Sequence, residues 1–267
     1  MLKKFEGHKI ITGFSTLLIL LTCAWAFFIN PRSFNLPTIA YVFMLFFLIA
    51  TFIFSLISYR QFTLGFLLSL FTLLTAWRIA GIYSIITITF PLLLVFILMF
   101  SNFIYCARSN LNQLNSPDRL SLGEWQLIFV RLYIGFNFVI HFTEKLFAGP
   151  LPHQADVNAF IQLGIPHPDL FVWLAGLCEF GAAVAIGLGF MMRIGAVCSA
   201  FYLFICTYLG RHFTLGFIWA NSGGGWEYPV LWTVLVLSFA WTGYHKFTID
   251  EMLEGNFNLP NWVRKLL

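Results

Sequence analysis

The sequence predicts an all-α, polytopic membrane protein, a bundle of about eight transmembrane helices. Of its 267 residues, 60% are hydrophobic and 10% are charged. A soluble globular domain usually carries about 25% charged residues. The hydrophobic residues also gather in runs of about 20, which is the length a helix needs to cross a bilayer. The chain therefore belongs to the integral-membrane class, and we expect contact with the lipid bilayer.

Four apolar runs without a central charge fill residues 1–107 and predict an N-terminal four-helix membrane region that serves as a mostly apolar scaffold. They cover about residues 10–29, 37–58, 62–80 and 83–106. Pro37 stands in the first turn of the second helix, where a missing N–H costs nothing. Pro91 lies inside the fourth run and should bend that helix or loosen a turn. The first run follows a basic start and no small-residue cleavage site closes it, so we expect a retained helix rather than a signal peptide.

A polar connector, residues 108–123, precedes a second four-helix membrane bundle at residues 124–247. Ser121 and Glu124 have the spacing of a capping box, so the fifth helix should begin there and run to about residue 147. The prolines of the loop 148–167 exclude a continuous helix and leave room for one short amphipathic turn at about 157–163. The remaining membrane helices are expected at about residues 168–190, 193–210 and 228–244.

The last residues, 248–267, predict an amphipathic surface tail. Thr248 and Glu251 repeat the capping spacing and should open a short helix. Trp262, Arg264 and Lys265 follow it and suit a membrane surface.

Charge bias predicts that both termini are cytoplasmic. An even number of crossings places them on one side, and cytoplasmic loops are rich in Lys and Arg. With the termini inside, most basic residues fall in the cytoplasm: Lys3, Lys4, Lys9, Arg60, Arg108, Arg119, Arg193, Lys246, Arg264 and Lys265. Few fall outside: Arg32, Arg78, Lys145 and Arg211.

Ionisable residues at membrane depth are the strongest functional signal, because each is costly unless it is paired or hydrated. A rise of about 1.5 Å per residue puts Arg131 and Glu179 within about 5 Å of the same depth. We therefore expect these two residues to form a buried ion pair. Such a pair is either a structural clamp between two helices or a group that handles protons or a ligand.

A second polar group is expected near the outer side. His141 and Lys145 are four residues apart and share one helix face. With Glu144, Arg211, His212, Glu227 and Tyr228 they are candidates to line a pocket that opens outward. The alternative for His141 is a satisfied interfacial residue. Three glycines before Glu227 allow close approach of the backbone to a neighbouring helix or a ligand, or only give a flexible loop.

Other sites have little support. Cys23, Cys106, Cys178, Cys198 and Cys206 contain no C-x-x-C pair, which favours structural thiols, and only Cys178 beside Glu179 stands out. No metal-ligand spacing or dinucleotide fingerprint is present, so no metal site is predicted. The net charge of +4 comes from scattered residues, so nucleic acid is not an expected partner.

An ordered series of residues resembles the DoxX family of bacterial membrane proteins. It comprises Arg131, Gly135, Phe138, His141 and Lys145, then Leu163–Pro166, Glu179, Gly187 and Arg193, and finally Gly224, Gly225, Glu227, Tyr228 and Pro229. The resemblance spans roughly residues 125–250. Phe142 and Glu144 depart from the pattern around His141.

The resemblance implies a subunit or accessory protein of a quinone-linked oxidoreductase, of the thiosulfate:quinone type, in the bacterial inner membrane. Glu179, Arg131 and His141 would then be catalytic, and Lys145, Arg211, His212, Glu227 and Tyr228 would bind substrate. Quinone is the implied cofactor. A partner redox subunit and a second copy of the chain are the candidate protein partners. The alternative is a membrane carrier or an assembly factor without enzymatic activity.

Overall fold

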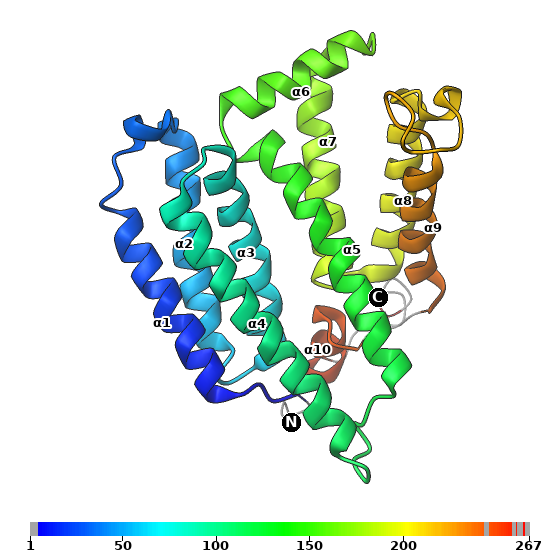
Figure 1. Ribbon diagram of the computed structural model, residues 1–267. Coiled ribbons are helices and arrows are strands. Elements are labelled where there is room, and N and C mark those ends of the chain that lie inside the picture. The colour runs from blue at the N-terminus through cyan, green and yellow to red at the C-terminus, as the bar shows by residue number, and fades with distance from the viewer. Residues whose placement is uncertain (1–4, 243–245, 258–259, 261–263, 265–267) are drawn as a thin grey trace. The chain divides into compact units, whose positions relative to one another are not determined.

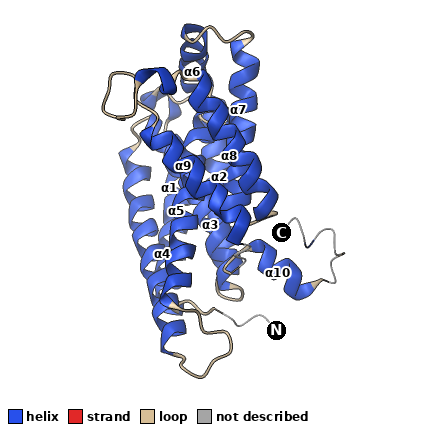
Figure 2. Ribbon diagram, turned by 90° about the vertical axis from the view of Figure 1, so that its right-hand side faces the viewer, coloured by secondary structure: helices blue, strands red, loops and turns tan. Residues whose placement is uncertain are grey.

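The computed structural model describes residues 5–242, 246–257, 260 and 264. This part of the chain is helical, with ten α-helices and no strand (Figures 1 and 2). Seven of them are long and apolar enough to cross a bilayer: α1 (Lys9–Ala26), α2 (Thr38–Ile57), α3 (Phe62–Ile82), α4 (Ile86–Asn112), α5 (Leu122–Leu146), α7 with its π-helical end (Pro168–Gly187) and α8 (Met192–Leu209). The prediction of a polytopic helical membrane bundle is confirmed.

The eighth predicted crossing corresponds to α9 (Glu227–Thr242), which is apolar but shorter, with 16 residues. Its predicted end at Tyr244 lies outside the described residues, as do Trp262 and Lys265 of the tail. The short helices are α6 (Pro150–Gln162) and α10 (Ile249–Asn256).

The chain divides into two compact units. The N-terminal unit contains Met1–Val130 and Leu146–Pro152, and the C-terminal unit contains Arg131–Lys145 and His153–Leu267. Helix α5 contributes to both.

In the N-terminal unit, four helices close into a ring. Helix α1 packs against α2 and α4, and α3 packs against the same two helices (Figure 1). Most of α3 is buried by its neighbours, whereas one face of α1, α2 and α4 is left to lipid. Helix packing in a membrane relies on close van der Waals contact and small or hydroxyl side chains, and this unit uses both.

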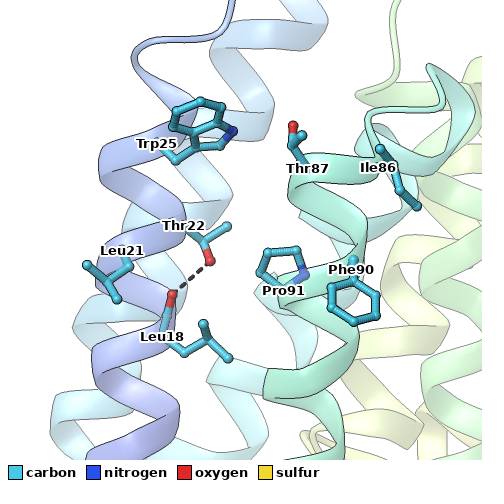
Figure 3. Close-up of a pocket in the computed structure, with 8 residues that line it drawn as sticks. All are labelled: Leu18, Leu21, Thr22, Trp25, Ile86, Thr87, Phe90 and Pro91. Carbon is cyan, nitrogen blue, oxygen red and sulfur yellow. Dashed lines mark hydrogen bonds between the residues drawn. The ribbon is translucent and has the colours of Figure 1, made fainter.

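An apolar groove of about 420 Å³ runs between α1 and α4 (Figure 3). It is lined by Leu18, Leu21, Thr22, Trp25, Ile86, Thr87, Phe90 and Pro91. The Thr22 hydroxyl donates to the Leu18 carbonyl, 2.7 Å away, so it offers no donor to the groove (Figure 3). Helix α4 continues through Pro91, but without an N–H there the Thr87 carbonyl loses its helical donor.

In the C-terminal unit, α5 and α7 run antiparallel and cross at two glycines. A Cβ on Gly135 would lie 2.2 Å from the backbone nitrogen of Gly187, so only glycine fits at 135. Gly187 is the last residue of the π-helical turn that ends α7, η2 (Ala183–Gly187). Helix α8 then packs against both α7 and α9.

The predicted capping box at Ser121 and the predicted helix start at Thr248 are confirmed. The Glu124 amide donates to Ser121 Oγ at 3.2 Å, and the Ser121 amide donates to Glu124 Oε2 at 2.7 Å. At the start of α10 the Glu251 amide donates to Thr248 Oγ1 at 3.0 Å.

Two boundaries differ from the prediction. Helix α6 has 13 residues rather than one turn, because Pro150 and Pro152 fall in its first turn, where proline is tolerated. Helix α4 continues past the apolar run to Asn112. Its Asn110 side chain accepts from the Leu120 amide at 2.9 Å and donates to the Asp118 carbonyl at 3.1 Å, which orders the last turn and the connector together.

Candidate functional site

A buried ion pair forms the centre of the C-terminal unit. Lys145 Nζ, near the end of α5, lies 3.1 Å from Glu179 Oε2 on α7. The Tyr202 hydroxyl on α8 donates to the other carboxylate oxygen at 2.8 Å. Lys145 is 9% exposed and Glu179 is 7% exposed. Three membrane-spanning helices thus place an amine, a carboxylate and a phenol in contact.

The direction of the side chains explains this pairing. A helical side chain leans toward the N-terminus of its own helix. Because α5 and α7 are antiparallel, Lys145 leans back along α5 while Glu179 leans toward the start of α7, and the two groups meet.

Helix α6 closes one side of the ion pair. Asp156 Oδ2 lies 3.9 Å from Lys145 Nζ, so one amine faces two carboxylates. His153 fixes α6, with Nδ1 2.8 Å from the Lys145 carbonyl and Nε2 3.0 Å from Asp169 Oδ1. His153 thereby ties α6 both to the end of α5 and to the first turn of α7.

The other side of Glu179 opens on a cavity of about 350 Å³. Its lining comes from α5, α7, α8, α9 and the loop before α9: Asn137, Phe138, His141, Glu179, Tyr202, Leu203, Cys206, Thr207, His212, Trp219, Tyr228, Pro229 and Trp232. This volume falls within the usual range of small-molecule sites.

One wall of the cavity is a series of aromatic rings. The centroid of Tyr228 lies 5.5 Å from that of Trp219 and 5.8 Å from that of Trp232. Trp232 also contacts Phe138 and His141, with centroids at 5.6 Å and 6.3 Å. Flat apolar walls with a few polar groups at one end suit a planar ligand that carries polar substituents.

The glycine-rich loop between α8 and α9 shapes this wall. A Cβ on Gly224 would lie 2.8 Å from the Trp219 ring, and its φ of +77° favours glycine. The Gly224 carbonyl contacts His212 Nδ1 at 2.9 Å, and Glu227 Oε2 accepts from the Trp219 amide at 3.2 Å. The glycines therefore serve close packing rather than loop flexibility alone.

Arg131 lies away from this cavity, and the predicted Arg131–Glu179 pair is wrong. Arg131 Nη1 donates to the carbonyls of Ile186 and Gly187 at 2.8 and 2.9 Å, and Nη2 donates to the Phe247 carbonyl at 2.7 Å. Arg131 leans toward the start of α5, so it moves away from Glu179 and reaches the last carbonyls of α7 instead. These carbonyls carry the negative end of the helix dipole, which favours a cation.

Asp250 completes the same region and was not expected from the sequence. It is buried, and its carboxylate accepts from the amides of Met191 and Met192 at 2.8 and 3.0 Å, at the start of α8. In return, the amides of Ile249 and Asp250 donate to the carbonyls of Leu188 and Gly189. These bonds hold the start of α10 against the turn between α7 and α8. We call the three residues that make this contact, Arg131, Phe247 and Asp250, the α10 clasp.

The structure brings together about half of the predicted site residues. His141, Glu179, His212 and Tyr228 line one cavity, and Lys145 joins them through Glu179. Glu227 is exposed and holds the loop by its contact with Trp219, and Arg211 is exposed with Nη2 3.5 Å from the Leu163 carbonyl.

Several residues of the site were missed from the sequence: Asn137, Asp156, Tyr202, Cys206, Thr207, Trp219 and Trp232. A phenol in the middle of the apolar run 193–210 was the available signal for Tyr202. In the described part of the chain, no three His, Cys, Asp or Glu side chains form a group that would hold a metal ion.

No curated protein matches the chain, and no solved structure matches it. The model of the DoxX family matches residues 126–212, which extend from α5 to the start of the loop before α9. This range contains Lys145, Glu179 and Tyr202. The match to the DoxX family model thus covers the part of the chain that builds the buried ion pair.

Proposed function

We propose that this DoxX-type membrane protein is the quinone-handling subunit of a membrane oxidoreductase, of the thiosulfate:quinone type and located in the bacterial inner membrane. One observation carries the proposal: the buried carboxylate and phenol of Glu179 and Tyr202 face the same cavity as the rings of Trp219, Tyr228 and Trp232. The choice of thiosulfate as the reduced substrate is based only on the resemblance to the DoxX family.

Reduction of a quinone to a quinol takes up two electrons and two protons. The apolar ring needs flat walls, and its two oxygens need hydrogen-bond donors that can also deliver protons. The Trp and Tyr wall supplies the first requirement. His141 and Tyr202 are the candidate donors among the residues that line the cavity. The Tyr202 hydroxyl donates to Glu179 in the structure, and it would turn to a quinone oxygen when the Glu179 carboxylate takes up a proton and donates to the phenol in its place.

Glu179 and Lys145 have a different role in this proposal. Lys145 balances the charge of the Glu179 carboxylate, and the carboxylate orients the Tyr202 hydroxyl. Asp156, which is partly exposed, lies on the far side of Lys145 and connects the ion pair to the surface of α6. A proton lost from the cavity end could then be replaced through Asp156, Lys145 and Glu179. The two electrons would come from the partner subunit that oxidises the reduced substrate.

Binding can be tested with purified protein in detergent and a short-tailed benzoquinone. Trp219 and Trp232 lie in the cavity wall, so binding should quench tryptophan fluorescence with a saturable dependence on quinone. Tyr202→Phe and Glu179→Gln should each weaken binding about tenfold, which corresponds to the loss of one hydrogen bond worth about 1.4 kcal/mol. Glu254→Gln, on the exposed face of α10, is the control and should leave the curve unchanged.

Quenching that rises linearly and equally in all variants would contradict the proposal, because it would report only partition of quinone into the micelle. If solute flux across reconstituted vesicles then depended on Glu179, the carrier alternative would replace it.

A further inference from the structure

A small polar hollow lies inside the N-terminal unit, among helices that the sequence predicted to be an apolar scaffold. It measures about 20 Å³ and is lined by Thr12, Ser15, Ile19, Ser55, Ser58, Phe62, Phe66, Ser69, Met99 and Asn102. All four helices of the ring contribute to it. Its polar lining consists of hydroxyls and one amide, and no charged side chain takes part.

Most of these hydroxyls already use their proton. Ser15 Oγ donates to the Thr12 carbonyl at 2.9 Å, and Ser55 Oγ donates to the Phe52 carbonyl at 2.7 Å. The Asn102 amide donates to Thr12 Oγ1 at 2.9 Å, and its oxygen accepts from the His8 amide at 2.6 Å. A hydroxyl that donates within its own helix still has lone pairs to offer. The hollow is therefore rich in acceptors.

The Ser69 hydroxyl is buried and lacks such a bond. The side chain is 1% exposed, faces the hollow from α3, and makes no hydrogen bond with the described residues of the chain. A buried hydroxyl without a partner costs about 1–3 kcal/mol, and in the middle of a membrane bundle lipid cannot supply one.

We propose that the hollow holds one structural water molecule. The water would accept from the Ser69 hydroxyl and donate to two of the facing hydroxyl oxygens. The volume agrees with this ligand, since a cavity needs about 10–15 Å³ to hold one water and the water needs two to four polar partners. The site links α1, α2 and α3 through one molecule.

Charge favours water over a monovalent cation. Sodium is also held by hydroxyl and amide oxygens, but a buried cation without a counter-charge carries a large desolvation cost. None of the lining residues supplies a negative charge.

The test compares thermal unfolding of Ser69→Ala with that of the wild type in detergent. If water is bound, the substitution removes one of its partners and should lower the melting temperature by roughly 2–4 °C, the shift expected for about 1 kcal/mol in a chain of this size. Ser101→Ala is the control, because Ser101 is exposed on α4 and donates within its own helix. An unchanged or higher melting temperature for Ser69→Ala would overturn the proposal, because it would mean that the hydroxyl has no partner to lose.

Ion exchange and imaging separate the remaining outcomes. Replacing sodium chloride by choline chloride should leave the melting temperature of the wild type unchanged. A decrease in the wild type that Ser69→Ala does not show would identify a sodium site and reject the water. A high-resolution map should show a single density peak within hydrogen-bond distance of Ser69 Oγ, and an empty hollow would also reject it.

Discussion

Gly135 and Gly187 bring the backbones of α5 and α7 into direct contact, and a Cβ on Gly135 would fall 2.2 Å from the Gly187 nitrogen. Lys145 meets Glu179 further along the same two helices. The glycine contact therefore sets the helix separation on which the ion pair depends.

Gly135→Ala should force these helices apart and destabilise the protein. Because the obstacle is backbone rather than a flexible side chain, we expect a loss of at least about 1–3 kcal/mol in the free energy of unfolding. Gly181→Ala on α7 is the matched control, since a Cβ there meets nothing within 4 Å and alanine favours a helix. Thermal unfolding of both variants checks this, and equal melting temperatures would contradict the close crossing.

The Lys145–Glu179 pair should show strong coupling in a double-mutant cycle. Lys145→Met leaves the Glu179 carboxylate buried without a cation, which costs about 3–5 kcal/mol. Glu179→Gln should cost less, because Asp156 still faces the Lys145 amine. The double variant removes both charges and should recover much of that loss. Denaturant unfolding of the four proteins measures the coupling. Additive losses would mean that the two groups act independently.

Arg131 should be irreplaceable even by lysine. Its guanidinium reaches three carbonyls in fixed directions, whereas a lysine amine is a point charge on a flexible stem. Arg131→Lys should therefore loosen the α10 clasp and increase hydrogen exchange in residues 247–256. Arg264→Lys, at an exposed position, is the control. A control within α10 itself would be less suitable. Glu251, for example, accepts from the Phe247 amide through Oε2 at 2.9 Å, so Glu251→Gln would also disturb the α10 clasp.

The cytoplasmic location of the termini stays a prediction that labelling can test. In a background without reactive native cysteines, Asn158→Cys on α6 should react with an impermeant thiol reagent added to intact cells. Asn115→Cys in the connector should react only after the membrane is opened. Both positions are exposed in the structure. The reverse pattern would invert the topology.

The sequence predicted the helices well because their signals are local. Apolar runs of membrane length and the Ser121 and Thr248 caps lie within a few residues of the structure that they specify. The partners of the charged residues were harder to predict. The position of a residue along its helix gives its depth in the membrane, but it does not give the direction in which its side chain points. Arg131 and Glu179 are near in depth but lean in opposite directions, so each found another partner.

Tyr202 and Asp156 were missed for a related reason. Nothing next to either residue in the sequence marks it as part of a site, and each joins the site only because α8 and α6 fold against α5 and α7. The hydroxyls around Ser69 were also overlooked, since serine in an apolar run is ordinary until four helices bring several together.

The α10 clasp also has a consequence for biogenesis. Arg131 is fully buried, yet Phe247, one of the residues whose carbonyls it binds, follows 116 residues later in the chain. During translation the helix that carries this guanidinium leaves the ribosome long before its set of acceptors is complete. A nascent chain stopped before residue 247 would therefore present quality-control proteases with a buried guanidinium that lacks this carbonyl.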